Sequence, residues 1–87
     1  LNAEDPEDGF RPSPGTLAAW KAPDGVRTDT HVRTGYVVPP HYDSLLAKLI
    51  SHDTDRPACV ARLRKALDEL QVEGVKTTRP LLRAVLD

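Results

Sequence analysis

The chain has 87 residues, a net charge of −1, and 39% hydrophobic and 29% charged side chains, a composition typical of one small globular domain and not of a disordered chain. The near-neutral charge excludes a protein that binds nucleic acid or a membrane surface by general electrostatic attraction. No apolar run approaches the roughly 18–20 residues that span a bilayer, and the single cysteine, Cys59, excludes an internal disulfide and favours a reducing compartment.

Prolines and glycines divide the first half of the chain into short extended pieces joined by turns. Strand candidates lie at residues 16–23, 26–32 and 35–40, and the second alternates apolar with polar residues as a half-buried strand does. Asp24-Gly25 is a hairpin-type turn signal between the first two runs. The double proline at 39–40 ends the third run.

The run from residue 44 to residue 52 is compatible with two structures. Its apolar residues Leu45, Leu46, Leu49 and Ile50 have helical spacing, but the run is short and polar residues follow it. Periodicity alone cannot separate a helix from a buried strand at this length.

A clear helix signal follows over about 56–70. Asp55 or Arg56 is placed to cap this helix, and Pro57 suits its first turn, where a missing N–H costs nothing. Steps of three and four residues put four apolar residues on one face: Val60, Leu63, Leu67 and Leu70. Ion pairs four residues apart are expected on the wet face, joining Arg64 to Asp68 and Lys65 to Glu69.

A strand and a second helix are predicted at the end of the chain. The first helix should stop before Gly74, and residues 72–76 form a strand candidate. The second helix is expected over 79–86, with Thr78 as its cap and with a buried face of Leu81, Leu82, Val85 and Leu86. Strands first and helices last predict an α+β fold, in which the two helices pack on a sheet or partial barrel of short, mainly antiparallel strands.

Neither the histidines nor the cysteine indicates a reactive centre. His31, His41 and His52 are ten and eleven residues apart, whereas metal sites usually use closer pairs. Cys59 has no evident activating base and is interpreted as a small packed residue. We therefore predict no catalytic, cofactor-binding or metal-binding residue within the chain itself.

A small basic cluster lies on the first predicted helix. It comprises Arg62, Arg64 and Lys65, and Asp68 and Glu69 balance it. Alternating charge of this kind is typical of a solvated helix face, so no nucleic-acid partner is predicted.

Short motifs in a single register run through the whole chain. They are LNAEDP (1–6), PSPG (12–15), GVR (25–27), VPP (38–40), YDS (42–44), KLI (48–50) and GVKT (74–77). Together they resemble the C-terminal domain of biotin carboxylase, the ATP-grasp component of acetyl-CoA, propionyl-CoA and pyruvate carboxylases. The resemblance implies that residues 1–87 are one such domain and that the run around Leu45–Ser51 is a strand.

The resemblance also implies what a complete enzyme adds to this domain. In the family an arginine immediately precedes the residue equivalent to Leu1 and stabilises the enolate-like form of biotin. The ATP-grasp lobes hold the magnesium-binding glutamates and the bicarbonate-binding lysine and arginine. Biotin, ATP and Mg are therefore expected as cofactors of the parent ligase, and the 87-residue chain alone is expected to bind none of them and to be inactive.

The resemblance implies partners as well. These are the ATP-grasp lobes of the same enzyme, the biotin carboxyl carrier and carboxyltransferase components, and a second copy of the parent in a homodimer. Arg27 matches an arginine at the dimer interface of bacterial family members. The family often has a longer Gly-Gly-Phe-Gly turn nearby, where this chain has only Asp24-Gly25. The expected location of the parent is the cytoplasm, and its expected role is in fatty acid biosynthesis.

Two alternatives accompany this hypothesis. The chain could be a non-catalytic interaction or dimerisation module that has kept the fold without the chemistry. It could also be a biotin carrier domain, which is disfavoured because a carrier displays its lysine in an Ala-Met-Lys-Met-like turn and this sequence has no Met. Lys48, in LLAKLI, lies in an apolar run that looks buried and unsuited to a swinging cofactor.

Overall fold

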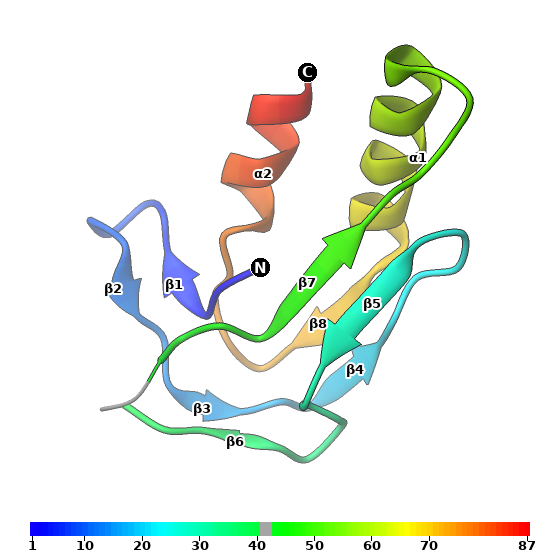
Figure 1. Ribbon diagram of the computed structural model, residues 1–87. Coiled ribbons are helices and arrows are strands. Elements are labelled where there is room, and N and C mark those ends of the chain that lie inside the picture. Colours follow the sequence, from blue (N-terminus) through cyan, green and yellow to red (C-terminus); the bar gives the residue numbers. More distant parts are fainter. Residues whose placement is uncertain (41–42) are drawn as a thin grey trace.

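The computed structural model describes residues 1–40 and 43–87 and has two helices standing side by side above a layer of short strands (Figure 1). His41 and Tyr42, named above among the histidines and the family motifs, lie outside the described residues. The elements in chain order are β1 (Glu4–Asp5), β2 (Arg11–Pro12), β3 (Gly15–Thr16), β4 (Ala19–Lys21), β5 (Arg27–Thr30), β6 (Val37–Val38), β7 (Ala47–Ile50), α1 (Arg56–Glu69), β8 (Gln71–Glu73) and α2 (Arg79–Leu86). The predicted α+β class is confirmed.

The strands of the described residues pair in twos, and every pair is antiparallel. The ladders are β1–β2, β3–β6, β4–β8 and β5–β7, so no barrel closes. Only the first ladder joins neighbours along the chain, whereas β4 and β8 are separated by most of the sequence. The sheet layer is thus assembled from long-range pairings.

The predicted hairpin at Asp24-Gly25 is wrong. The strands on either side of this turn do not pair with each other, because β4 pairs with β8 and β5 pairs with β7. The predicted strand at 16–23 is also divided into β3 and β4, each bonded to a different partner. Between them Leu17 is fully buried, and its carbonyl accepts a hydrogen bond from Gly35 N–H at 2.8 Å.

The strand that the resemblance implied around Leu45–Ser51 is confirmed as β7. Thr30 pairs with Ala47 and Arg27 with Ile50, which sets β7 beside β5 over its whole length. The strand predicted at 72–76 begins one residue earlier, as β8.

The helices have almost the predicted bounds, because their ends are fixed by local signals. Asp55 caps α1, its carboxylate accepting a hydrogen bond from Ala58 N–H at 2.8 Å, and Pro57 occupies the first turn. Thr78 stands at the N-cap position of α2 but does not cap it through its side chain. Its hydroxyl instead accepts a hydrogen bond from Asn2 N–H at 3.0 Å.

The core has two parts. One is a cluster of residues from the strands and loops: Ala3, Leu17, Val32, Val38 and Leu46. The other is the inner face of α1, where Ala66, Leu67 and Leu70 are buried. The predicted burial of the α2 apolar face is wrong, since no residue of α2 is buried and the exposed fraction is 41% for Leu81 and 72% for Val85.

Candidate functional site

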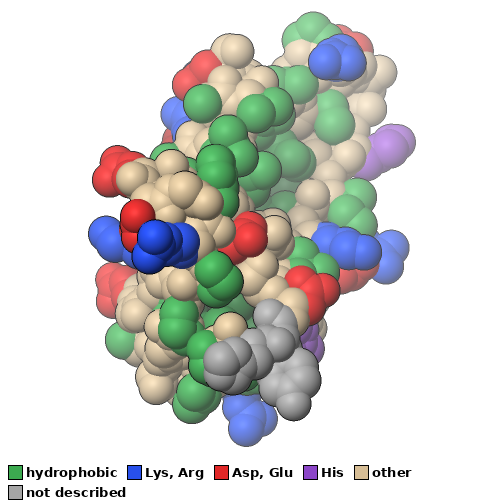
Figure 2. Space-filling model, turned by 90° about the vertical axis from the view of Figure 1, so that its left-hand side faces the viewer, with side chains coloured by type: hydrophobic (Ala, Val, Ile, Leu, Met, Phe, Trp, Pro, Cys, Tyr) green, Lys and Arg blue, Asp and Glu red, His purple; other side chains and the backbone are tan. Residues whose placement is uncertain are grey.

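An apolar groove runs between β7 and the two helices. It has a volume of about 330 Å³ and is lined by Leu1, Leu45, Ala47, Lys48, Leu49, Leu63, Leu67, Leu82, Val85 and Leu86. Figure 2 shows hydrophobic side chains gathered in a hollow in the upper part of the molecule. Three of the four α2 residues that were predicted to be core, Leu82, Val85 and Leu86, therefore form one wall of an open groove.

The groove is open because α2 is held to α1 at its polar side. Arg83 bonds Asp68 of α1 at 2.8 Å, and Arg64 of α1 reaches Asp87 at 2.9 Å. Arg79 Nη1 also donates to the Leu67 carbonyl at 3.3 Å. These contacts replace the predicted pair of Arg64 with Asp68, while the predicted pair of Lys65 with Glu69 is confirmed at 3.8 Å.

Leu1 lies at the floor of the groove, where it pairs with β7 as a strand would. Leu1 C=O accepts hydrogen bonds from both Leu46 N–H (2.9 Å) and Ala47 N–H (3.3 Å), and the Leu1 nitrogen donates to Ala47 C=O at 2.9 Å. Two residues of one strand thus oppose one residue of the other, which is the arrangement of a β-bulge. Burial lowers the pKa of the Leu1 amino group below its ordinary value, since desolvation disfavours its charged form.

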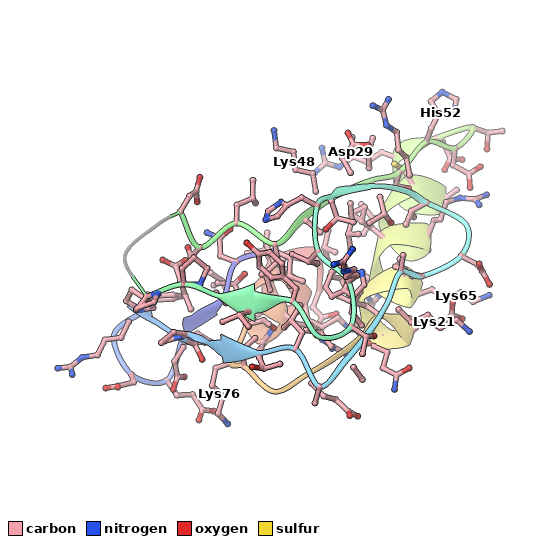
Figure 3. All side chains as sticks on the ribbon, turned by 90° about the horizontal axis from the view of Figure 1, so that it is seen from below. Lys21, Asp29, Lys48, His52, Lys65 and Lys76 are labelled. Atoms are coloured by element: carbon pink, nitrogen blue, oxygen red, sulfur yellow. The ribbon has the colours of Figure 1, made fainter. Side chains whose placement is uncertain are left out.

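Leu46 and Ala47 of the apolar run are buried, as predicted, but Lys48 itself is exposed. Side chains alternate between the faces of a strand, so Ala47 and Leu49 are covered in the groove while Lys48, which also borders the groove, is exposed. Lys48 pairs in register with Asp29 of β5, and Figure 3 shows both side chains at the outer edge of the molecule. This outer face of the β5–β7 ladder carries charge, and the inner face is apolar.

Arg27 lies on the same outer part of β5. Its side chain is 72% exposed, and its Nε donates to the Asp29 carboxylate at 2.9 Å. The hydrogen bond to Asp29, and then its charge, raise the pKa of the Arg27 guanidinium. The side chain is therefore held along the strand and available to a partner.

Arg62 connects α1 to the turn that precedes β5, a role that the sequence did not reveal. Its Nε and Nη2 donate to the Asp53 carboxylate at 3.1 and 2.8 Å, and its Nη1 donates to Gly25 C=O at 3.2 Å. The pKa of Asp53 is lowered, first by the hydrogen bond from Thr54 N–H and then by that from Arg62. The basic cluster is thus engaged in structural ion pairs.

The other sequence candidates do not come together in one site. His31 packs edge-on against Tyr36, with 5.3 Å between the ring centroids, whereas His52 is exposed in the segment between β7 and α1. Cys59 Sγ lies 3.4 Å from Ser51 C=O, consistent with a packed thiol. Within residues 1–40 and 43–87, no three His, Cys, Asp or Glu side chains are grouped to hold a metal ion. Neither helix of this part is long and apolar enough to cross a membrane.

These features define the class of the protein: it is a small α+β domain with paired short strands, two helices and an uncovered apolar groove. Comparison with known proteins identifies the family: the model of the biotin carboxylase C-terminal domain matches residues 1–87, and the chain belongs to this family. The resemblance read from the sequence motifs is therefore confirmed.

Relatives and solved structures agree with this assignment. Biotin carboxylase from Pseudomonas aeruginosa is 52% identical over 83 residues, which are 93% of this chain and 18% of that protein. Urea carboxylase from Kluyveromyces lactis superposes with a TM-score of 0.95 at 41% identity, covering 99% of this chain and 8% of that one. The biotin carboxylase domain dimer of the Hydrogenobacter thermophilus 2-oxoglutarate carboxylase, in complex with MgADP and bicarbonate, superposes with a TM-score of 0.93 at 44% identity. This match covers 98% of the present chain and 19% of that one. The chain thus spans about a fifth or less of the proteins that it matches.

Proposed function

We propose that this chain acts as the C-terminal domain of a biotin carboxylase, which uses ATP and bicarbonate to carboxylate biotin. The observation that carries the proposal is the similarity to biotin carboxylases over the whole chain, at 46% identity over 89 residues with the enzyme from Haemophilus influenzae. In this proposal the ATP-grasp lobes of the parent hold ATP, Mg and bicarbonate. The present domain supplies a rigid framework beside them, and by itself it is inactive.

The acyl-CoA carboxylases are the proposed class of the parent. A biotin-dependent acyl-coenzyme A carboxylase subunit from Mycobacterium leprae is 47% identical over 88 residues, whereas two pyruvate carboxylase structures are 30% and 39% identical. The proposal accordingly includes acetyl-CoA or propionyl-CoA as the final acceptor, biotin carboxyl carrier and carboxyltransferase partners, and a cytoplasmic role in fatty acid biosynthesis.

The test is complementation in the parent protein. The whole protein should hydrolyse ATP in a reaction that depends on both bicarbonate and biotin. A form truncated immediately before Leu1 should lose this activity, and adding the 87-residue chain should restore it. If the whole protein shows no such hydrolysis, the proposal is wrong, and a non-catalytic interaction module becomes the better hypothesis.

We propose in addition that Arg27 lies at a homodimer interface of the parent. The proposal is supported by its exposed position on the charged face of β5 and by the dimer described for the H. thermophilus domain. Arg27→Glu should weaken dimerisation in sedimentation velocity experiments on the whole protein. Arg11→Glu, at a side chain that is 78% exposed on β2, makes the same charge change elsewhere and should leave the dimer intact. Equal behaviour of the two variants would contradict the interface.

A further inference from the structure

One edge of β5 is unpaired within residues 1–40 and 43–87, while β7 covers the other edge over its whole length. Peptide groups along a strand point alternately to its two edges. Ala47 of β7 directs its N–H and C=O to Leu1, so its partner Thr30 is not hydrogen-bonded across the β5–β7 ladder and directs its own peptide groups away from β7. Thr28, two residues earlier, does the same. The N–H and C=O of Thr28 therefore point to the unpaired edge, with no hydrogen-bond partner among the described residues.

The charges that flank Thr28 are opposite in sign. Arg27 and Asp29 lie on the same outer face of β5, with side chains that are 72% and 44% exposed. Many edge strands carry charges that keep a second strand away. Here a base and an acid stand two positions apart, so the edge is complementary in charge to a copy of itself that runs antiparallel.

The charges also select one register for such a pairing. In a two-fold contact, residue i of one copy meets residue j of the other, and j meets i. An axis at Thr28 puts Arg27 opposite Asp29 of the second copy, twice. An axis at Arg27 or at Asp29 puts like charges directly opposite each other, which is destabilising, and an axis at Thr30 puts Arg27 opposite Arg33. The register with opposite charges is thus also the one in which the two Thr28 peptide groups can exchange hydrogen bonds.

We propose that two copies of the parent protein dimerise by pairing their β5 strands edge to edge, antiparallel, about Thr28. This inference rests on the proposed function, in which Arg27 lies at a homodimer interface, and it names the arrangement of that interface. The two ladders then join into one sheet of four strands, β7–β5–β5–β7. Because Lys48 pairs in register with Asp29, the charges across the outer face alternate: Lys48, Asp29, and Arg27 of the second copy.

Mixing two singly substituted forms of the whole parent protein tests the register. Arg27→Glu leaves two acids at positions 27 and 29, and Asp29→Arg leaves two bases there. Each variant alone should dimerise about tenfold more weakly than the wild type, or worse, because both cross-strand pairs become repulsive. A mixture should form heterodimers, since both pairs are attractive again. One variant carries a fluorescent label, and sedimentation velocity detects the heterodimer.

The matched control replaces Asp29→Arg with Asp8→Arg, the same charge change at a side chain that is 65% exposed in the segment between β1 and β2. Mixed with Arg27→Glu, it should give clearly fewer heterodimers. Equal amounts in the two mixtures, or no heterodimer in either, would overturn the β5 pairing. An Asp29→Arg variant that dimerises as tightly as the wild type would also overturn it.

Amide hydrogen exchange on the unmutated protein gives a second measurement. Thr28 N–H should be protected in the dimer and exchange fast after dilution to the monomer, and equal exchange in both states would refute the pairing. The failures are distinguishable. If Arg27→Glu alone stays fully dimeric, the proposed Arg27 interface is wrong, and the pairing with it. If heterodimers form but the parent shows no biotin-dependent ATP hydrolysis, the carboxylase function alone is refuted.

Discussion

Replacing Gly74 with alanine should unfold much of the domain, because this glycine lies where β8 meets the segment between β3 and β4. Its φ of +108° is a conformation that residues with a side chain rarely adopt. A Cβ atom there would overlap Thr16 O and lie 2.9 Å from Ala18 N. Both neighbours are backbone atoms, so relief requires that the strands separate.

The magnitude follows from the strain and from the hydrogen bonds at this crossing. A non-glycine residue in a sparsely populated backbone region costs about 1–3 kcal/mol. Separating the strands also weakens the bond from Ala18 N–H to Glu73 C=O, now 2.8 Å, and the adjoining β4–β8 pair, each worth about 1 kcal/mol. The total of about 3–5 kcal/mol is most of the stability of a domain that gains only about 5 kcal/mol or somewhat more on folding.

Urea titration of the 87-residue chain, followed by far-ultraviolet circular dichroism, measures this loss. Gly35→Ala is the matched control, because Gly35 has a φ of +90° but a Cβ there would meet nothing within 4 Å. The control carries the conformational strain without the clash and should lose about 1–2 kcal/mol. If Gly74→Ala loses no more stability than Gly35→Ala, the argument from close backbone approach is refuted.

Three smaller changes test other contacts in the same titration. Asp55→Ala removes the α1 cap and should cost about 1 kcal/mol, and an unchanged midpoint would contradict the capping role. Thr28 Oγ1 is buried and has no hydrogen-bond partner among the described residues, so Thr28→Val should stabilise the chain by about 1 kcal/mol, whereas a loss would reveal an unrecognised partner. The pKa of Asp53 is lowered in the folded state, so its stabilising effect is present above the unfolded pKa of about 4 and is lost as the pH falls through the folded value. The advantage of the wild type over Asp53→Asn should therefore be constant near neutral pH and shrink in acid, and a constant advantage down to pH 2 would contradict the assignment.

The parts of the fold that could be predicted from the sequence are those determined by neighbouring residues. Asp55 and Pro57 fix the start of α1 through contacts within one helical turn, and both helices have nearly the expected bounds. Strand pairing failed at Asp24-Gly25 because a turn signal describes only its own four residues. Which strands pair depends on distant segments, and β4 pairs with β8 about fifty positions away.

The groove could not be predicted for a related reason. The spacing of Leu82 and Val85 shows that α2 has an apolar face, but it does not show whether anything within the chain covers that face. The Arg62 contacts were missed because Asp53 and Gly25 lie 9 and 37 positions from it, with no pattern that links them. The family motifs supplied what periodicity could not, since they correctly favoured a strand over a helix for β7.

Several residues of these family motifs make hydrogen bonds that hold the fold together. Asn2 and Thr78 hydrogen-bond in both directions, through Asn2 N–H to the Thr78 hydroxyl and Thr78 N–H to Asn2 C=O, each at 3.0 Å. Ala3 is fully buried and accepts from Ser13 N–H at 2.8 Å, and the Ser13 hydroxyl in turn accepts from Lys76 N–H at 2.9 Å.

The segments LNAEDP, PSPG and GVKT are therefore joined in one hydrogen-bonded network that ties the first residues of the chain to the start of α2. This network fixes Leu1 against β7. The family signature therefore acts first on the fold, because its residues hold the start of the chain, the turn before β3 and the start of α2 in one arrangement.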